Sequence, residues 1–98
     1  MLRKKIFKTK NEAEVTFEFS REGVTCVSLV ADFNDWKPVA MKFNKKAKAF
    51  RTKARLPKNK SFQFRYLLNN SEWENDYQAD KYLPNIFGSE DSVVVTKN

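Results

Sequence analysis

The stretch SFQFRYLL, residues 61–68, has the most regular hydrophobic pattern in the chain. Phe62, Phe64 and Tyr66 occupy every second position, and Arg65 lies between the last two. A period of two residues is typical of a β-strand with one buried face. We therefore expect the three aromatic side chains to be buried and Arg65 to be exposed on the opposite face, because a shift of one residue would turn every side chain over.

Four further segments show β-strand character. VTFEF (15–19) alternates in the same way, TCVSLVAD (25–32) is a β-rich run that ends in turn-forming residues, and SVVVT (92–96) closes the chain. KAFRTKARL (48–56) places basic residues at alternate positions, which predicts an edge or surface strand because charged side chains discourage pairing between edges.

The predicted fold class is all-β, with six or seven short strands and no convincing helix. Turn signals at this spacing favour an antiparallel β-sandwich over a barrel. The 98 residues are enough for one domain, so residues 1–98 are expected to form a single β-sandwich whose first ten or so residues are a basic lead-in. The lone Cys26 excludes an intramolecular disulfide, and we expect it to pack as a small hydrophobic residue. Neither a secretory signal nor a membrane-spanning run is recognisable, so the cytoplasm is the expected location.

The net charge of +7 is unevenly distributed. Residues 37–60 contain ten basic and no acidic residues, whereas residues 11–36 and 72–91 each contain six acids and one base. Trp36 and Trp73, the two tryptophans of the chain, lie within or at the end of the acidic segments. The basic segment with its phenylalanines could follow a phosphate backbone, but acids beside both tryptophans would repel phosphate where stacking is available. Nucleic acid is therefore not the expected partner, and neither is a membrane.

Catalysis is not expected either. The chain has no histidine and one cysteine, which excludes the usual zinc sites, Ser-His-Asp arrangements and Cys-His pairs. The carboxylates of residues 72–80 could in principle act in pairs on a glycosidic bond, but a sandwich of this size has little depth for a catalytic cleft. We expect a solvated acidic loop there, no cofactor and no metal.

A neutral sugar suits these surroundings better than an anion. An exposed indole can cover the apolar face of a glucose ring, while amide, carboxylate or guanidinium groups bond its hydroxyls. Trp36 follows Asn34-Asp35 and precedes Lys37-Pro38, and Trp73 sits between two glutamates. Both tryptophans are therefore expected in polar turns, exposed to solvent.

Three ordered motifs carry a family resemblance: VSLVADFNDWKPVAM, FQFRYLLNNSEWENDYQADKY and NIFGSEDSVVV. They resemble the family-48 carbohydrate-binding module, the glycogen-binding domain found in the AMP-activated kinase β subunit and at the N-termini of isoamylases and branching enzymes. The chain is most similar to small bacterial stand-alone versions. The resemblance implies an immunoglobulin-like, early-set β-sandwich and the sugar-binding residues Trp36, Arg65, Trp73, Phe87, Ser89 and Asp91. Phe87 replaces the leucine and Asp91 the asparagine of the family's loop.

The expected function is non-catalytic binding of α-1,4-glucan, meaning glycogen, starch or a maltooligosaccharide, by two stacking tryptophans. Modules of this family are associated with glycoside hydrolases. The alternative is a protein-interaction or regulatory module, in which the same aromatic surface docks a partner enzyme of glucan metabolism.

Overall fold

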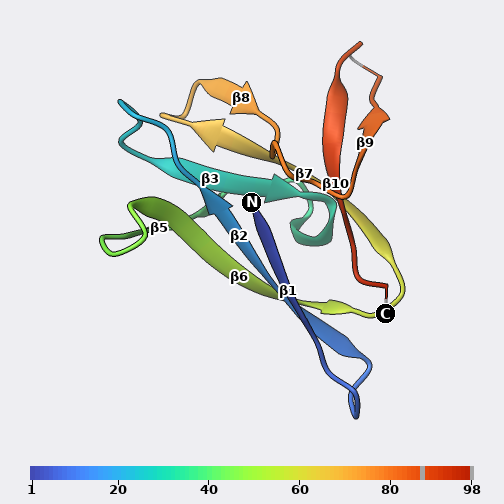
Figure 1. The fold of residues 1–98 in the computed structure, drawn as a ribbon. Helices are drawn as coiled ribbons and strands as arrows, with labels where there is room; N and C mark the ends of the chain where they lie inside the picture. The colour runs from blue at the N-terminus through green and yellow to red at the C-terminus, as the bar shows by residue number, and fades with distance from the viewer. Residues whose placement is uncertain (87, 98) are drawn as a thin grey trace.

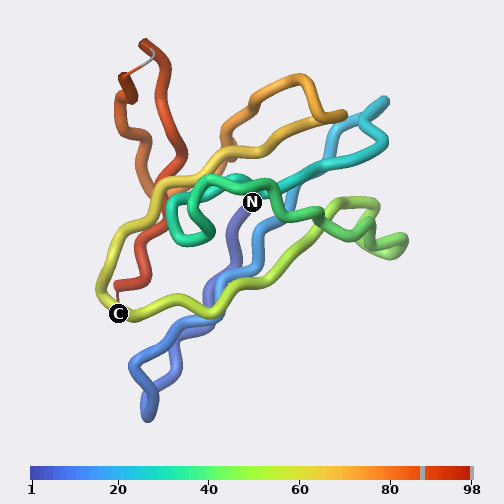
Figure 2. Tube along the Cα trace, turned by 180° about the vertical axis from the view of Figure 1, so that it is seen from behind, coloured from blue at the N-terminus to red at the C-terminus, as the bar shows by residue number. Residues whose placement is uncertain are grey.

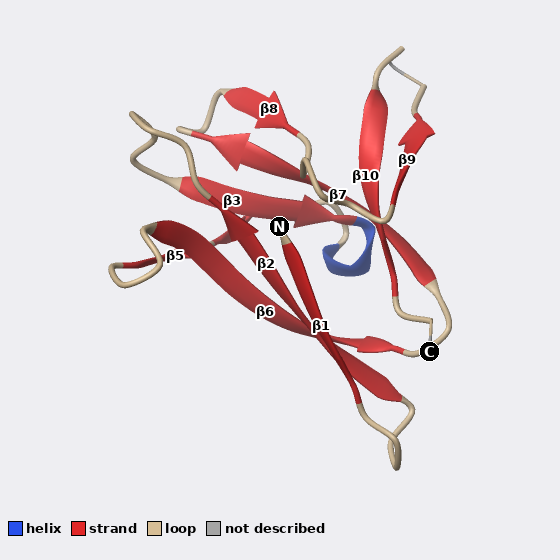
Figure 3. Cartoon of the chain, in the orientation of Figure 1, coloured by secondary structure: helices blue, strands red, loops and turns tan. Residues whose placement is uncertain are grey.

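Two antiparallel β-sheets packed face to face form this protein, in a computed structural model that describes residues 1–86 and 88–97 (Figures 1 and 3). The all-β sandwich predicted from the sequence is confirmed. A short 3₁₀ turn, η1 (Asp32–Asn34), follows one of the strands, and the described part of the chain contains no α-helix. None of its helical structure is long and apolar enough to span a membrane.

The first sheet has the strand order β1-β2-β6-β5, formed by β1 (Leu2–Ile6), β2 (Glu12–Phe19), β6 (Ala49–Pro57) and β5 (Lys42–Asn44). The second has the order β4-β3-β7-β10-β9, formed by β4 (Val39–Ala40), β3 (Val27–Ala31), β7 (Ser61–Leu68), β10 (Glu90–Val95) and β9 (Lys81–Pro84). The short strand β8 (Glu72–Glu74) also pairs with β7. In both views the β1–β2 hairpin extends past the sandwich at one end and the β9–β10 hairpin at the other (Figures 1 and 2).

The core lies between β2 and β7. Phe17 of β2 and Phe64 of β7 are fully buried, with their ring centroids 5.0 Å apart in an edge-to-face arrangement. Tyr66 is also fully buried, and Phe62 packs at the margin of the core and is only partly buried. The predicted register of residues 61–68 is therefore confirmed, because the alternate residues of β7 point to opposite faces.

Strand β6 differs in part from the expected edge strand. It lies between β2 and β5, although β5 pairs only with its first residues, Ala49–Arg51. Its predicted faces are confirmed: Phe50 is buried, and Arg51 and Arg55 lie on the opposite, outer face. The bases on that face oppose the glutamates of β2 in the ion pairs Arg51–Glu18, Lys53–Glu14 and Arg55–Glu12.

Residues 1–10, expected as a basic lead-in, contain β1, which pairs with β2 along its length and places Leu2 against the core. One other expectation was wrong. Cys26 is exposed instead of packed. The alternation of β3 explains this position, since its core-facing residues are Val27, Leu29 and Ala31, so the residue before Val27 points the other way.

Candidate functional site

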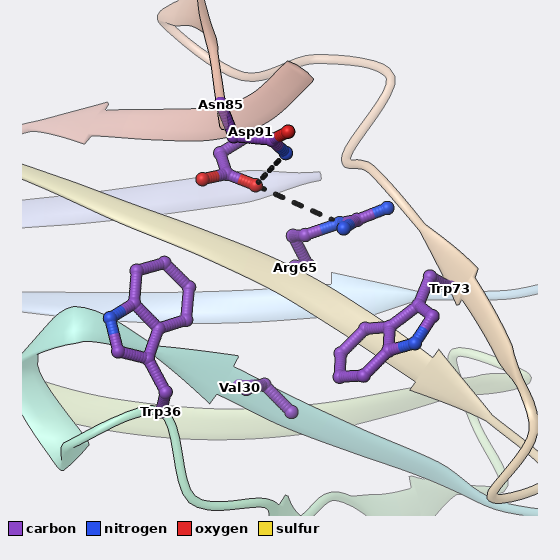
Figure 4. Close-up of a pocket in the computed structure, with 6 residues that line it drawn as sticks. All are labelled: Val30, Trp36, Arg65, Trp73, Asn85 and Asp91. Carbon is purple, nitrogen blue, oxygen red and sulfur yellow. Dashed lines mark hydrogen bonds and ion pairs between the residues drawn. The ribbon is translucent and has the colours of Figure 1, made fainter. Parts of the chain in front are cut away.

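A pocket of about 600 Å³ lies on the outer face of the second sheet (Figure 4). Its lining side chains come from or beside β3, β7, β8, β9 and β10, and they are Val30, Trp36, Arg65, Trp73, Asn85 and Asp91. Four of the six site residues predicted from the sequence are among them. The fold therefore brings together residues that lie as far apart in the chain as Trp36 and Asp91.

Trp36 is placed by the tight turn that ends β3. The Asn34 side-chain oxygen accepts a hydrogen bond from the Ala31 backbone N–H at 3.1 Å, and the Trp36 N–H donates to the Ala31 carbonyl at 2.8 Å. Asp35 and Trp36 both have left-handed backbone conformations, with φ of 59° and 58°. This conformation is uncommon for residues other than glycine, and here the indole remains 44% exposed beside the sheet.

A second contact fixes this turn to the central strand of the sheet. The Asp32 carboxylate accepts a hydrogen bond from the backbone N–H of Gln63 in β7 at 3.0 Å. The turn that holds Trp36 is thus attached to the same strand that supplies Arg65. The acidic residues before Trp36 therefore build the turn, which the sequence indicated only as a turn-forming cluster.

Trp73 lies on strand β8 and not in the predicted turn. The turn is shorter than expected, and residues Glu72–Glu74 pair with Tyr66–Leu68 of β7, with Trp73 opposite Leu67. Because Leu67 points away from the core, Trp73 shares the outer face of the sheet. Its side chain is 47% exposed, as the prediction of a solvent-accessible tryptophan requires.

Arg65 occupies the middle of the pocket. Its Nε lies 3.8 Å from Asp91 Oδ1, and its guanidinium carbon lies 5.3 Å from the centre of the Trp73 ring. The expectation of a freely exposed Arg65 was wrong, because neighbouring side chains leave its side chain only 22% exposed. The Nε atom is buried and has no hydrogen-bond partner among the residues that the structure describes. A buried donor without an acceptor is costly, and the nearby Asp91 carboxylate offsets part of that cost by its charge.

Asp91 is buried beside Arg65 and is held by the β9–β10 hairpin. The Asn85 side-chain amide donates to Asp91 Oδ1 at 3.1 Å and to the Ser89 hydroxyl at 2.9 Å. Ser89 is exposed and hydrogen-bonded to Asn85, and it is not among the residues that line the pocket. Phe87, the remaining predicted site residue, lies outside the described residues.

Val30 and Asn85 line the pocket without having been predicted. Val30 lies opposite Arg65 in the β3–β7 register, on the outer face, where it forms an apolar floor. A valine at an outward position of a strand was a usable signal, because such positions are normally polar. Asn85 opened the third sequence motif, but only the fold shows that its amide reaches Asp91.

The chemistry of the pocket is that of a binding surface with two aromatic sides, an apolar floor and a polar wall. Figure 4 shows the two indoles on opposite sides of Arg65 and Val30, with Asp91 and Asn85 above them. Such a surface suits a ligand that has both C–H faces and hydroxyl groups. Within residues 1–86 and 88–97, no group of three or more His, Cys, Asp or Glu side chains could hold a metal ion.

Comparison with known proteins assigns no family to this chain. A scan against protein-family models finds no match. A search of the curated proteins finds no relative. The antiparallel sandwich and the pocket on its outer face are the findings from which a function can be inferred.

Proposed function

We propose that this protein binds α-1,4-glucan without catalysis, as a family-48 carbohydrate-binding module with an immunoglobulin-like, early-set sandwich. The ligand would be glycogen, starch or a maltooligosaccharide. The observation that supports this proposal best is the pocket itself. Trp36 and Trp73 are half-exposed there, on either side of the apolar floor and the polar wall. Glucose units would stack on the two indoles, and the α-linkage, which follows from the family resemblance, would curve the chain between them.

The polar residues of the pocket match the rim of a sugar. Arg65 offers guanidinium N–H donors, and Asp91 offers carboxylate oxygens that accept hydrogen bonds. Asp91 is the one carboxylate among the lining residues, whereas glycoside hydrolysis generally uses two. This composition supports binding of an intact glucan.

The charge distribution argues against an anionic polymer. The arginines and the lysine on the outer face of β6 are paired with the glutamates of β2, so three of the ten bases in the basic segment 37–60 lie opposite acids. The pocket lies on the other sheet and combines one arginine with one aspartate. A neutral ligand fits this balance better than a phosphate backbone does.

A second candidate function is docking of a partner enzyme of glucan metabolism. It is favoured by exposed apolar side chains on the β9–β10 hairpin beside the pocket, namely Tyr82, Leu83 and Ile86. Exposed apolar side chains near two tryptophans are typical of protein-interaction surfaces. In this case the pocket would be covered by protein and would show no affinity for free glucan.

Titration with maltoheptaose, followed by calorimetry, tests the glucan proposal. Trp36→Ala and Trp73→Ala should each weaken binding about five- to twelvefold, because the loss of a stacking contact of about 1–1.5 kcal/mol corresponds to roughly that factor. Phe43→Ala is the matched control, since Phe43 is 54% exposed but does not line the pocket, and it should bind as the wild type does.

Two further measurements distinguish α-glucan binding from binding of a phosphate backbone and of a β-linked glucan. The affinity should change little between low and high salt, whereas phosphate contacts would weaken it by orders of magnitude. A β-linked glucan of the same length should bind much more weakly, because its flat chain does not follow two separated rings. Absence of maltoheptaose binding by the wild type would favour the docking function, and a steep loss with salt would exclude the sugar site.

A further inference from the structure

Strand β8, which carries Trp73, is weakly attached to the sheet. Its three residues pair with Tyr66–Leu68 of β7, and its other edge pairs with no strand in the part of the chain that the structure describes. Three paired residues supply few hydrogen bonds, and short isolated pairings are marginally stable in water. The position of Trp73 relative to the pocket therefore needs support from outside the sheet.

That support comes from Arg21, in the segment that follows β2 of the opposite sheet. Its Nη2 donates to Glu74 Oε2 at 2.7 Å, and its Nη1 lies 3.9 Å from Glu72 Oε2. Glu72 and Glu74 flank Trp73, and because side chains alternate along a strand, they point to the face opposite the indole. Arg21 thus contacts β8 on the face opposite the indole, through both residues next to Trp73.

Arg21 is itself held in place. Its guanidinium carbon lies 5.4 Å from the centre of the ring of Phe19, which belongs to the core, and its Nη2 also donates to the Tyr77 hydroxyl. The hydrogen bond from Arg21 to Glu74 raises the pKa of Arg21. Burial raises the pKa of Glu74, but hydrogen bonds from Arg21 and from the Asn75 N–H outweigh burial, so the pKa of Glu74 lies below its usual value. Both shifts favour the charged forms that make the contact.

We propose that Arg21 is a positioning residue that fixes Trp73 for ligand binding, so that the segment after β2 affects the affinity of a pocket on the second sheet. The part of this proposal that concerns affinity rests on the proposed glucan function. The part that concerns the order of Trp73 does not, because it describes the protein without a ligand.

The order of Trp73 can be measured without sugar. In a Trp36→Phe background Trp73 is the sole tryptophan, so its fluorescence anisotropy and its quenching by acrylamide report on β8 alone. Arg21→Gln should lower the anisotropy and increase the quenching, and Arg21→Lys should restore part of both because it keeps the charge. The matched control is Arg51→Gln, which removes a comparable ion pair, to Glu18, on the outer face of the first sheet. It should leave both signals unchanged.

Binding is then measured with both tryptophans present. Arg21→Gln should weaken maltoheptaose binding by up to about fivefold, because the contribution of an exposed ion pair is small. Arg51→Gln should bind as the wild type does, and the melting temperatures of the two variants should be similar. Glu74→Gln should reproduce part of the effect of Arg21→Gln, and the double variant should add little to Arg21→Gln, because the Arg21–Glu74 contact is already lost in Arg21→Gln.

The outcomes distinguish the two proposals. Unchanged anisotropy and quenching in Arg21→Gln would overturn the positioning role, whatever happens to glucan binding. Loosening of Trp73 in a protein that does not bind maltoheptaose would support the positioning role and reject the glucan function. If Arg21→Gln does not fold, Arg21→Lys and Glu74→Gln provide the same comparison. An equal loss of Trp73 order in Arg51→Gln would also reject the proposal, since it would show a general loss of stability.

Discussion

The backbone of Trp36 is unusual for a bulky residue. Its φ of 58° follows the φ of 59° at Asp35, so two consecutive residues adopt the left-handed conformation. This conformation brings Cβ close to the following carbonyl and costs roughly 1–2 kcal/mol for residues other than glycine. Strained residues of this kind are concentrated at functional sites. Here the left-handed backbone directs the indole of Trp36 over the sheet.

A comparison of glycine and alanine tests this strain at the residue scale. We expect Trp36→Gly to be more stable than Trp36→Ala by about 1 kcal/mol, because glycine adopts a positive φ without a steric penalty. Trp73 is the control: it lies in an extended strand, so Trp73→Gly should be less stable than Trp73→Ala by about 0.5–1 kcal/mol. Urea denaturation measures both differences. The same sign at the two positions would contradict a strained Trp36.

At the scale of the element, β7 connects the core to the pocket. One face contributes Phe64 and Tyr66 to the core, and the other places Arg65 in the pocket. On either side, β3 contributes Val30 and β10 contributes Asp91, so the register of a single central strand aligns three pocket residues. The site and the core therefore depend on the same strand pairing.

Phe64→Ala should destabilise the protein by about 3–5 kcal/mol, which is a large part of the total stability expected for a domain of this size. Phe64 is fully buried, and its ring contacts Phe17 and Tyr66 at centroid distances of 5.0 and 5.7 Å. Phe43→Ala, at an exposed position, should cost less than about 1 kcal/mol. Thermal or urea denaturation would show the difference. A Phe64→Ala protein that melts like the wild type would mean that the register of β7 is wrong.

This strand also shows what the sequence could predict. The alternation of β7 was visible because one face is fully buried, and both tryptophans were expected to be accessible because acids and amides surround them. The strands β1, β4, β5, β8 and β9 were missed, since they are short and largely exposed and therefore have no period of two. The role of Asn85 in the pocket and the ion pairs of Arg21 with β8 depend on contacts between segments that lie apart in the chain. Local sequence patterns do not encode such contacts.

For the whole molecule, one buried carboxylate links several parts of the sandwich. Asp76 is fully buried, and its Oδ2 accepts a hydrogen bond from the Tyr66 hydroxyl at 2.7 Å and lies 2.5 Å from the Met1 amino group. The Gln78 N–H donates to its Oδ1 at 2.7 Å. Burial, and then the charge of Asp76 and its hydrogen bond, raise the pKa of Tyr66 above its usual value of 10.0.

The raised pKa of Tyr66 predicts a loss of stability at alkaline pH. A group whose pKa is higher in the folded state stabilises that state fully below its unfolded pKa, and the contribution is lost as the pH rises above about 10. Tyr66→Phe should be less stable than the wild type at neutral pH by about 1–3 kcal/mol, because it removes a hydrogen bond to a buried charge. Urea denaturation between pH 8 and about 11 should show this difference narrowing as the pH rises. A constant difference would mean that Tyr66 ionises as readily in the folded protein as in the unfolded chain.

The pocket draws its side chains from positions between 30 and 91, and its polar wall is supplied by β10, which pairs with β7 and β9. No local segment contains enough of the site to bind by itself. Contacts between distant parts of a chain form late and slowly, since loop closure must come first. During refolding, ligand binding should therefore appear only once the complete sheet has formed. No early folding intermediate should bind the ligand. A bound ligand would accordingly slow global unfolding instead of only protecting a loop.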